Sequence, residues 1–447
     1  MREASQRESV SPWLGEPDEP ARLLRGERRV DVAVIGAGLT GLSSALALRR
    51  AGLEVALLES RFAGFGASGR NAGHLTPTIG KDLTTLQRVY GQERVRELVA
   101  LAEHAVGHVE RQIEQLGIDC DYEPVGNVVA AVHPRQYRRL DREAEAARRC
   151  GVTVELIEPD AMERRGLPRR FLRGLLEPHG GILDPGKYVR GLRQAALKAG
   201  AELYEGSPVT RIEEGATLRL HTASGTVRAS HAVIASNAFT PALGRLRSAG
   251  LRLQVQLFRS ERLSAEQLAA LGWEGREGLY TAHELLESYR LTRDQRIVGG
   301  AKRVRYGFGG RVLPDVEASI AALLERSFRQ RFPELAQLRI ERHWGGPIFM
   351  SLDFLPVVGR GGRHGNLLHS IGYAGHGLAQ ASYAGEMIAD LLLERDGLGA
   401  VLWRRRRLPT PPEPLRWLVF HALHGLFAAL DRRVDREPAG PSPIDSP

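Results

Sequence analysis

The sequence contains little cysteine and no long apolar run. Only Cys120 and Cys150 occur among 447 residues, and their spacing matches no metal or redox motif. We therefore expect two free thiols in a reducing compartment and no metal site. No run reaches the ~18 apolar residues of a membrane-spanning helix, and the polar N-terminus has no apolar segment typical of a secretory signal. These absences predict a cytoplasmic protein.

Aromatic residues make up only 6% of the chain. This scarcity matters for the question of whether the positive charge serves nucleic-acid binding. The net charge is +9 and the pI is near 9.9, values that invite a nucleic-acid partner. Arginine is, however, spread over the whole chain among Glu and Asp, and no basic cluster is interleaved with aromatics as a base-stacking surface would be. We expect no nucleic-acid binding, and attraction to anionic substrates or an anionic membrane is the milder alternative.

Residues 29–59 carry the strongest motif. An apolar run ends at Ile35 and is followed by Gly36, Gly38 and Gly41 in G-x-G-x-x-G spacing, a helix pattern, and a second apolar run that ends at Glu59. The glycines permit a tight turn, close approach of the backbone to a pyrophosphate, and close packing of helix on strand. The helix N-terminus attracts phosphate, and the acid binds ribose hydroxyls. The pattern predicts a dinucleotide site.

Further dinucleotide-like elements recur far along the chain, at 180–240 and 345–395. We expect an α/β protein whose Rossmann-like domain is discontinuous, with a second α+β domain built on an antiparallel sheet. The expected boundaries are an N-terminal arm at 1–28; the dinucleotide domain at 29–80, 176–245 and 345–408; the second domain at 81–175 and 246–344; and an apolar helix with a disordered tail at 409–447.

Four separated segments resemble the D-amino acid oxidase / glycine oxidase superfamily of FAD-dependent oxidoreductases, with the closest likeness to γ-glutamylputrescine oxidase-type proteins. The likeness covers roughly residues 10–408. The segments are the glycine fingerprint with Glu59; the Gly-rich loop Gly66–Gly73; Ser207–Thr210 with Ala235–Ala238; and Asp353–Gly359 followed by Gly372–Gly377.

The resemblance implies FAD as the cofactor, held along the first, second and fourth segments, with adenine against Val209. The C-terminal segment would place backbone N–H groups and a helix N-terminus near the flavin pyrimidine. The residues expected to hold FAD are Gly36, Gly38, Leu39, Thr40, Gly41, Glu59, Ser60, Arg61, Ala67, Ser68, Asn71, Ala72, Gly73, Val209, Ser236, Asn237, Gly372, Gly375, His376, Gly377 and Leu378.

Two departures from the family pattern narrow the expected substrate. Amino acid oxidases of the family carry an Arg for the substrate carboxylate where this chain has Ile348, and isoleucine cannot replace a bidentate guanidinium. This favours an amine substrate, or an amino acid held by another Arg. No Cys lies in 340–395, so the covalent flavin link of the sarcosine oxidase branch is not expected here.

The resemblance implies oxidation of a C–N bond by hydride transfer to flavin, giving an imine that hydrolyses. The candidates for catalysis are His74, Tyr289 and Lys302, and those for substrate binding are Arg290 and Ile348. For His74 a structural role is an equal alternative, and Tyr289, Arg290 and Lys302 have surface or strand-pairing alternatives. Oxygen or a quinone would take the electrons. A tRNA-modification flavoprotein and a non-catalytic flavin-binding protein are less favoured alternatives.

The segment Leu415–Leu430 is apolar on nearly all sides and is flanked by Arg404–Arg407 and by Arg432 and Arg433. It is too short to span ~30 Å of hydrocarbon. It would either pack on the protein or lie in a membrane interface with its arginines at the lipid head groups. The second alternative predicts peripheral contact with the inner membrane and fits a dehydrogenase that reduces a quinone.

Overall fold

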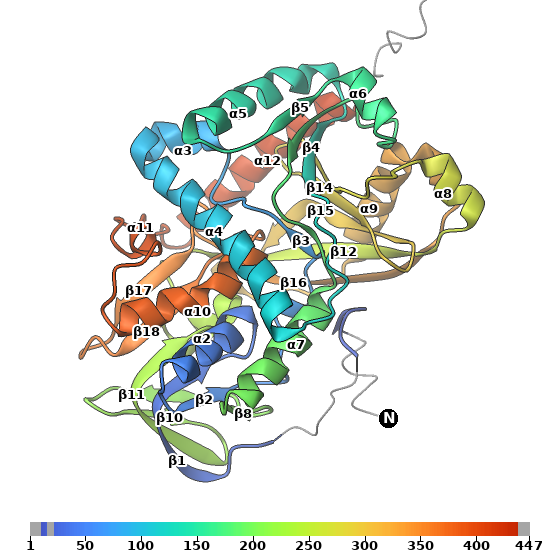
Figure 1. The fold of residues 1–447 in the computed structure, drawn as a ribbon. Coiled ribbons are helices and arrows are strands. Elements are labelled where there is room, and N and C mark those ends of the chain that lie inside the picture. Colours follow the sequence, from blue (N-terminus) through green and yellow to red (C-terminus); the bar gives the residue numbers. More distant parts are fainter. Residues whose placement is uncertain (1–9, 16–21, 437–447) are drawn as a thin grey trace, which may run out of the picture.

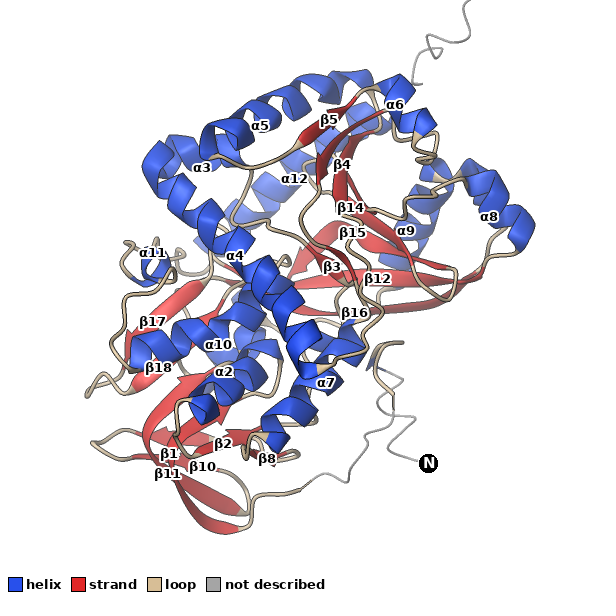
Figure 2. Cartoon of the chain, in the orientation of Figure 1, coloured by secondary structure: helices blue, strands red, loops and turns tan. Residues whose placement is uncertain are grey.

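The computed structural model describes residues 10–15 and 22–436, and these residues form two large β-sheets with helices packed on each (Figure 1). Figure 2 shows the first sheet in the lower half of the molecule, behind a layer of helices, and the second sheet in the upper half. The expected disordered tail at 437–447 lies outside the described residues, as do 1–9 and 16–21 of the expected arm.

The first sheet is mostly parallel and has the order β17-β18-β11-β1-β2-β8. Neighbours from β8 to β18 run parallel, β17 is antiparallel to β18, and the hairpin β9–β10 is joined to β11. The strands are β1 (Gly26–Ile35), β2 (Val55–Leu58), β8 (Glu202–Tyr204), β9 (Arg211–Glu213), β10 (Leu218–His221), β11 (Gly225–Ile234), β17 (Val357–Gly361) and β18 (Leu367–Ile371).

One face of this sheet is covered by helices α2 (Leu39–Arg50), α7 (Pro185–Lys198) and α10 (Leu378–Leu392) (Figure 1). Helix α2 is buried continuously from Leu39 to Leu48 because it lies between the sheet and the other helices. Helix α4 (Gln92–Leu116) packs on the same core through its apolar stripe, which includes Leu98, Ala102 and Val109. Small side chains, such as Ala45 of α2 and Ala102 of α4, lie in this core and let the helices pack closely.

The second sheet has the order β16-β12-β15-β14-β13-β4-β6-β5 and is antiparallel except between β13 and β4. Helix α9 packs against β12 and β15, and α5 packs over β4–β6. The elements are β4 (Asn127–Ala131), β5 (Glu155–Ile157), β6 (Arg173–Glu177), β12 (Leu251–Arg262), β13 (Gly278–Thr281), β14 (Glu287–Leu291), β15 (Arg296–Tyr306), β16 (Ile340–Met350), α5 (Tyr137–Cys150) and α9 (Ala318–Arg331).

The remaining elements connect or flank the two sheets. A short ladder of β3 and β7 lies where they meet, and α12 crosses the second sheet's side of the molecule. These elements are β3 (His74–Leu75), β7 (Gly181–Ile182), α3 (Leu83–Tyr90), α6 (Pro159–Arg164), α8 (Ala265–Leu271), α11 (Ala400–Trp403) and α12 (Leu415–Arg436).

The observed ends of several strands do not coincide with the expected domain boundaries. The boundary at 176 cuts β6 and the boundary at 345 cuts β16, and both strands belong to the second sheet. Strand β1 begins inside the expected arm. Helix α4, placed in the second domain by the sequence, contributes to the core of the first. Alternating and continuous apolar runs predict strands but do not show which sheet a terminal residue joins.

Candidate active site

The turn between β1 and α2 has no room for side chains. Gly36 has a φ of +105°, and a Cβ there would lie 2.9 Å from the carbonyl oxygen of Ala235. A Cβ at Gly41 would lie 1.8 Å from the Gly36 carbonyl oxygen, so the helix packs directly on the turn. Gly38 precedes α2 and provides no side-chain cap. The helix N-terminus is thus held close to the sheet with its dipole directed at the turn.

Glu59 follows β2 beside this turn. Its carboxylate accepts hydrogen bonds from the backbone N–H groups of Ala37 (2.8 Å) and Arg61 (2.9 Å) and from the Ser60 hydroxyl (3.0 Å). Burial raises the pKa of the Glu59 carboxyl, and these donors oppose that rise. The carboxylate is therefore oriented at the wall of the site.

The Gly-rich loop 66–73 is held by donors from three separate parts of the chain. The carbonyls of Arg70, Asn71 and Ala72 accept hydrogen bonds from Trp344 Nε1 (2.8 Å), Trp13 Nε1 (2.9 Å) and Arg290 Nε, respectively. Inside the loop, Asn71 Oδ1 accepts from Gly73 N at 2.9 Å. Three successive carbonyls are thereby fixed, which makes the loop a rigid wall rather than a mobile connection.

The C-terminal glycine segment meets the first turn from the other side. Gly372 N donates to Asn237 Oδ1 at 2.9 Å, and the hydroxyls of Tyr373 and Thr40 are 2.7 Å apart. His376 lies at the wall with its Nε2 buried and without a hydrogen-bond partner among the described residues. Burial lowers the pKa of His376 to about 4, so its ring is neutral at pH 7.

These segments enclose one continuous cavity of about 1040 Å³. Of the residues expected to hold FAD, all but Gly41, Arg61 and Gly372 line it. The lining members are Gly36, Gly38, Leu39, Thr40, Glu59, Ser60, Ala67, Ser68, Asn71, Ala72, Gly73, Val209, Ser236, Asn237, Gly375, His376, Gly377 and Leu378.

His74 directly follows the Gly-rich loop and lines the cavity. The Asn127 side-chain amide donates to Leu75 O (2.9 Å), so its oxygen accepts from His74 Nδ1 at 3.0 Å. This assigns the proton to Nδ1 and leaves a lone pair on Nε2, which has no partner among the described residues. Burial lowers the pKa of His74 to about 3, so the ring is a neutral hydrogen-bond acceptor.

Tyr289 and Arg290, two of the expected site residues, do not line the cavity. Tyr289 is buried in the core of the second sheet and donates its hydroxyl to Glu287 Oε2 at 2.8 Å. The Arg290 guanidinium holds Ala72 O and stacks over the Trp13 ring at 5.0 Å. Adjacent strand residues face opposite sides, and here neither side chain reaches the cavity. The expected contact of these two side chains with the cavity is therefore not observed.

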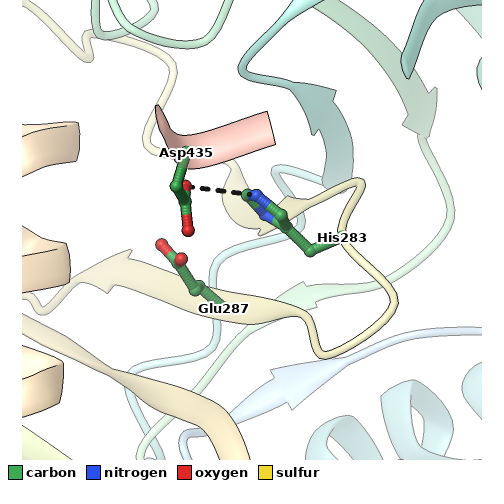
Figure 3. A group of neighbouring side chains, drawn as sticks. All are labelled: His283, Glu287 and Asp435. Carbon is green, nitrogen blue, oxygen red and sulfur yellow. Dashed lines mark ion pairs between the residues drawn. The ribbon is translucent and has the colours of Figure 1, made fainter. Parts of the chain in front are cut away.

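Lys302 lines the cavity but is already paired. Its ammonium contacts Glu287 and lies 3.1 Å from Asp435 Oδ2, and Arg331 binds the same two carboxylates. Figure 3 shows Asp435 of α12 and Glu287 of β14 converging beside His283, whose Nε2 is 3.4 Å from Asp435. Two acids matched by two cations give this group, the α12 latch, the character of an ion-pair cluster rather than of a metal site.

Ile348 lines the cavity as expected, and a Cβ at Gly375 would lie 3.6 Å from its Cδ1. Sequence reasoning missed other wall residues, including Glu177, Tyr280 and the inner face of α12 with Phe420 and Phe427. No local motif marks these positions, because they reach the wall only through the packing of distant elements.

The geometry defines a class of protein, a dinucleotide-binding flavoprotein. The glycine turn without room for a Cβ, the N-terminus of α2 with Gly38 at its N-cap, and the second glycine segment at the far wall fit the two ends of FAD. The chain belongs to the family described as FAD dependent oxidoreductase (DAO), which matches residues 31–391. It is an FAD-dependent oxidoreductase acting on amines or amino acids, so the expected fold class, cofactor and reaction class are confirmed.

Known proteins of similar sequence and structure agree with this assignment. Gamma-glutamylputrescine oxidoreductase of Escherichia coli (strain K12) is 33% identical over 368 residues, covering 81% of this chain and 83% of that protein. Glycine oxidase of Bacillus licheniformis is 26% identical over 378 residues, covering 82% and 94%. The crystal structure of glycine oxidase from Geobacillus kaustophilus has a TM-score of 0.72 at 22% identity, covering 85% of this chain and 100% of that one.

Membrane attachment was one of the two alternatives for the C-terminal helix. Helix α12 packs on the protein through Trp417 and Phe420 and extends to Arg436, six residues beyond the expected end. None of the helices in the described part of the chain combines the length and apolar character needed to cross a bilayer.

Proposed function

We propose that this oxidoreductase acts on an amine that lacks a neighbouring carboxylate. The observation that supports this is Ile348, a branched apolar side chain in the cavity wall beside the Gly375 segment. Bound FAD supplies the acceptor for a hydride from the carbon next to the nitrogen, and water hydrolyses the resulting imine. An apolar wall there excludes water and offers no charge to a carboxylate.

In this proposal the chain's own residues hold FAD and orient the amine. The residues that line the cavity along the glycine turn, the Gly-rich loop and the C-terminal glycine segment would hold the cofactor. His74 accepts a hydrogen bond from the amine N–H at Nε2, which keeps the nitrogen lone pair directed away from the imidazole. Because the His74 ring remains neutral far below pH 7, it adds no negative charge that would hold the amine in its protonated form, and hydride loss requires the neutral amine.

The test uses purified holoprotein under anaerobic conditions. Primary and secondary alkylamines should bleach the visible flavin absorbance, whereas α-amino acids with the same carbon chain should do so at least tenfold more slowly. Equal rates for both would overturn the amine proposal and favour an amino acid held by another cation at the wall, for which Arg303 is the candidate. His74→Leu should raise KM with little loss of bound flavin.

A second proposal concerns the electron acceptor and the membrane. The outer face of α12 carries Leu415, Leu418, Val419, Leu423, Leu426 and Leu430, each at least 41% exposed. Exposed arginines follow it at Arg432 and Arg433 and precede it at Arg404 and Arg406. An apolar face between cationic ends is the pattern of a helix lying in an anionic interface. We infer that α12 rests on such a membrane.

The inner side of the same helix supports a quinone as acceptor. Phe420, His424 and Phe427 line the cavity, and Val419 and Leu423 belong both to the wall and to the exposed face. A lipid-dissolved acceptor would therefore meet the cavity at α12. Oxygen is the alternative acceptor and needs no such contact.

Vesicle flotation tests this second proposal. The holoprotein should float with phosphatidylglycerol vesicles and not with phosphatidylcholine vesicles, and Leu418→Asp combined with Leu426→Asp should abolish flotation. Leu398→Asp, at a position between α10 and α11 that is 44% exposed against 54% for Leu418 and Leu426, is the matched control. Reoxidation of the reduced flavin by a soluble quinone and by oxygen should be compared in parallel. Loss of flotation in the control alone would contradict the assignment of α12.

A further inference from the structure

The cavity extends beyond the flavin segments into an arm between the second sheet and helices α4 and α5. The arm begins at His74 and Tyr280, whose ring centroids are 4.7 Å apart, and continues along an apolar wall. Three carboxylates also line it: Glu103 of α4, Glu143 of α5 and Glu177 at the end of β6. The apolar wall consists of Val99, Val129, Leu140, Ala147, Val152, Val154 and Leu175.

Two of the three acids have partners within the protein. Glu143 accepts hydrogen bonds from the backbone N–H of Leu83 (2.9 Å) and the hydroxyl of Thr84 (2.5 Å). Glu103 contacts the His179 ring. Two cations that line the arm, Arg139 and Lys81, share the carboxylate of Glu284, at 3.0 Å and 3.9 Å.

Glu177 has no hydrogen-bond or ion-pair partner among the described residues. Burial, followed by the charges of Glu103 and Glu143, raises the pKa of its carboxyl to about 7. An ionised carboxylate next to two others in an apolar channel is costly unless it takes up a proton or a cation neutralises it. Within the described chain no such cation reaches it.

Polar groups near the start of the arm are also without partners. Thr76 is 5% exposed and lines the cavity, and its hydroxyl has no hydrogen-bond partner in the described part of the chain. The buried Nε2 of His74 is likewise unpaired there. Buried polar groups are normally satisfied. A buried imidazole nitrogen without a partner, together with a carboxylate and a hydroxyl that face the cavity without a partner in the described chain, therefore indicates a ligand that brings N–H donors.

We propose that the arm binds the second cationic end of an α,ω-diamine, with its ammonium at Glu177 and its alkyl chain along the apolar wall. The reacting amine then lies at His74, toward the flavin segments. This inference rests on the proposed function and names its substrate class. The ammonium supplies the charge that Glu177 lacks, and the methylene chain matches a wall that offers it no hydrogen bonds.

The experiment compares α,ω-diaminoalkanes of increasing chain length with n-alkylamines of the same length. Equilibrium dialysis measures their binding to holoprotein whose flavin has been chemically reduced, so no turnover occurs. Wild type should bind the best diamine about tenfold to a hundredfold more tightly than its matched monoamine, and Glu177→Gln should remove that difference. Glu145→Gln, on the exposed side of α5, is the control and should keep it.

The outcomes separate the arm from the proposed function. If no amine bleaches the flavin of the wild type, the proposed function fails. If amines bleach it but diamines and monoamines bind equally, or Glu177→Gln leaves a diamine preference intact, the arm proposal is overturned. Glu177→Asp guards against a folding defect, since it keeps the charge and should retain part of the preference.

Discussion

Replacing Asp435 by Asn tests whether the α12 latch fastens the C-terminal helix over the cavity. Asp435 is the contribution of α12 to the latch, at 3.1 Å from Lys302 Nζ and 3.4 Å from His283 Nε2, and in contact with Arg331. Its side chain is 16% exposed and that of Glu287 is 1% exposed. The substitution leaves two buried cations facing a single carboxylate.

The expected cost is about 3 kcal/mol, the lower part of the range for removing one partner of a buried ion pair. We take the lower part because asparagine keeps one hydrogen-bond acceptor and because the site is partly open to solvent. Outside the latch, the buried residue of α12 is Asp431, which accepts hydrogen bonds from the Glu284 and Leu285 N–H groups at 2.9 Å. Because the helix has few other anchors, the loss should appear as local opening of the helix. A cost of this size increases the open population roughly a hundredfold.

Amide hydrogen exchange of residues 415–436, resolved by mass spectrometry, measures that opening directly. Arg432→Gln, an exposed change of one charge on the same turn, should leave the exchange rates unaltered. Adding Lys302→Gln to Asp435→Asn should restore part of the protection, because it removes one excess cation. Unchanged protection of α12 in Asp435→Asn would refute the view that the latch holds the helix.

Three further predictions concern the rest of the structure. Gly41→Ala should reduce bound flavin to near zero, measured as flavin per polypeptide, because its Cβ would lie 1.8 Å from the Gly36 carbonyl oxygen and overpacking there costs about 3 kcal/mol. Trp13→Phe should lower the free energy of unfolding by about 1 kcal/mol in urea, since it removes one hydrogen bond to the Gly-rich loop. The pKa of Glu287 lies at about 2 against an ordinary 4.5. Its contribution of about 3 kcal/mol to the free energy of unfolding is therefore complete above pH 4.5 and is lost as the pH falls through 2. Glu287→Gln should remove this pH dependence of the free energy of unfolding between pH 4.5 and 2.

The sequence predicted features that depend on neighbouring residues. The turn at Gly36, the helix that follows it and the position of Glu59 are encoded within 31 residues, and the structure assembles them as expected. The glycine spacing predicts a tight turn with close backbone contacts, and the apolar periodicity predicts which face of a helix or strand is buried. Both are local properties of the chain.

The sequence could not predict the features formed between distant segments. Glu177 ends an ordinary strand and becomes notable only because α4 and α5 bring two more carboxylates to it. Tyr289 and Arg290 were assigned to the cavity from their strand alone, but the other residues packed on that strand decide their roles. The α12 latch joins residues separated by more than 130 positions.

The position of β1 at the centre of the first sheet determines when the flavin site can be completed during folding. Its parallel partner β11 lies some 200 residues further along the chain, and β18, which pairs with β11, lies further still. Contacts of such long range form slowly. The glycine turn therefore remains without its second wall until residues 372–378 have folded against it. An amino-terminal fragment that keeps the whole fingerprint should consequently bind no flavin, and interruption of the chain before β11 leaves the apolar edge of β1 exposed to other chains.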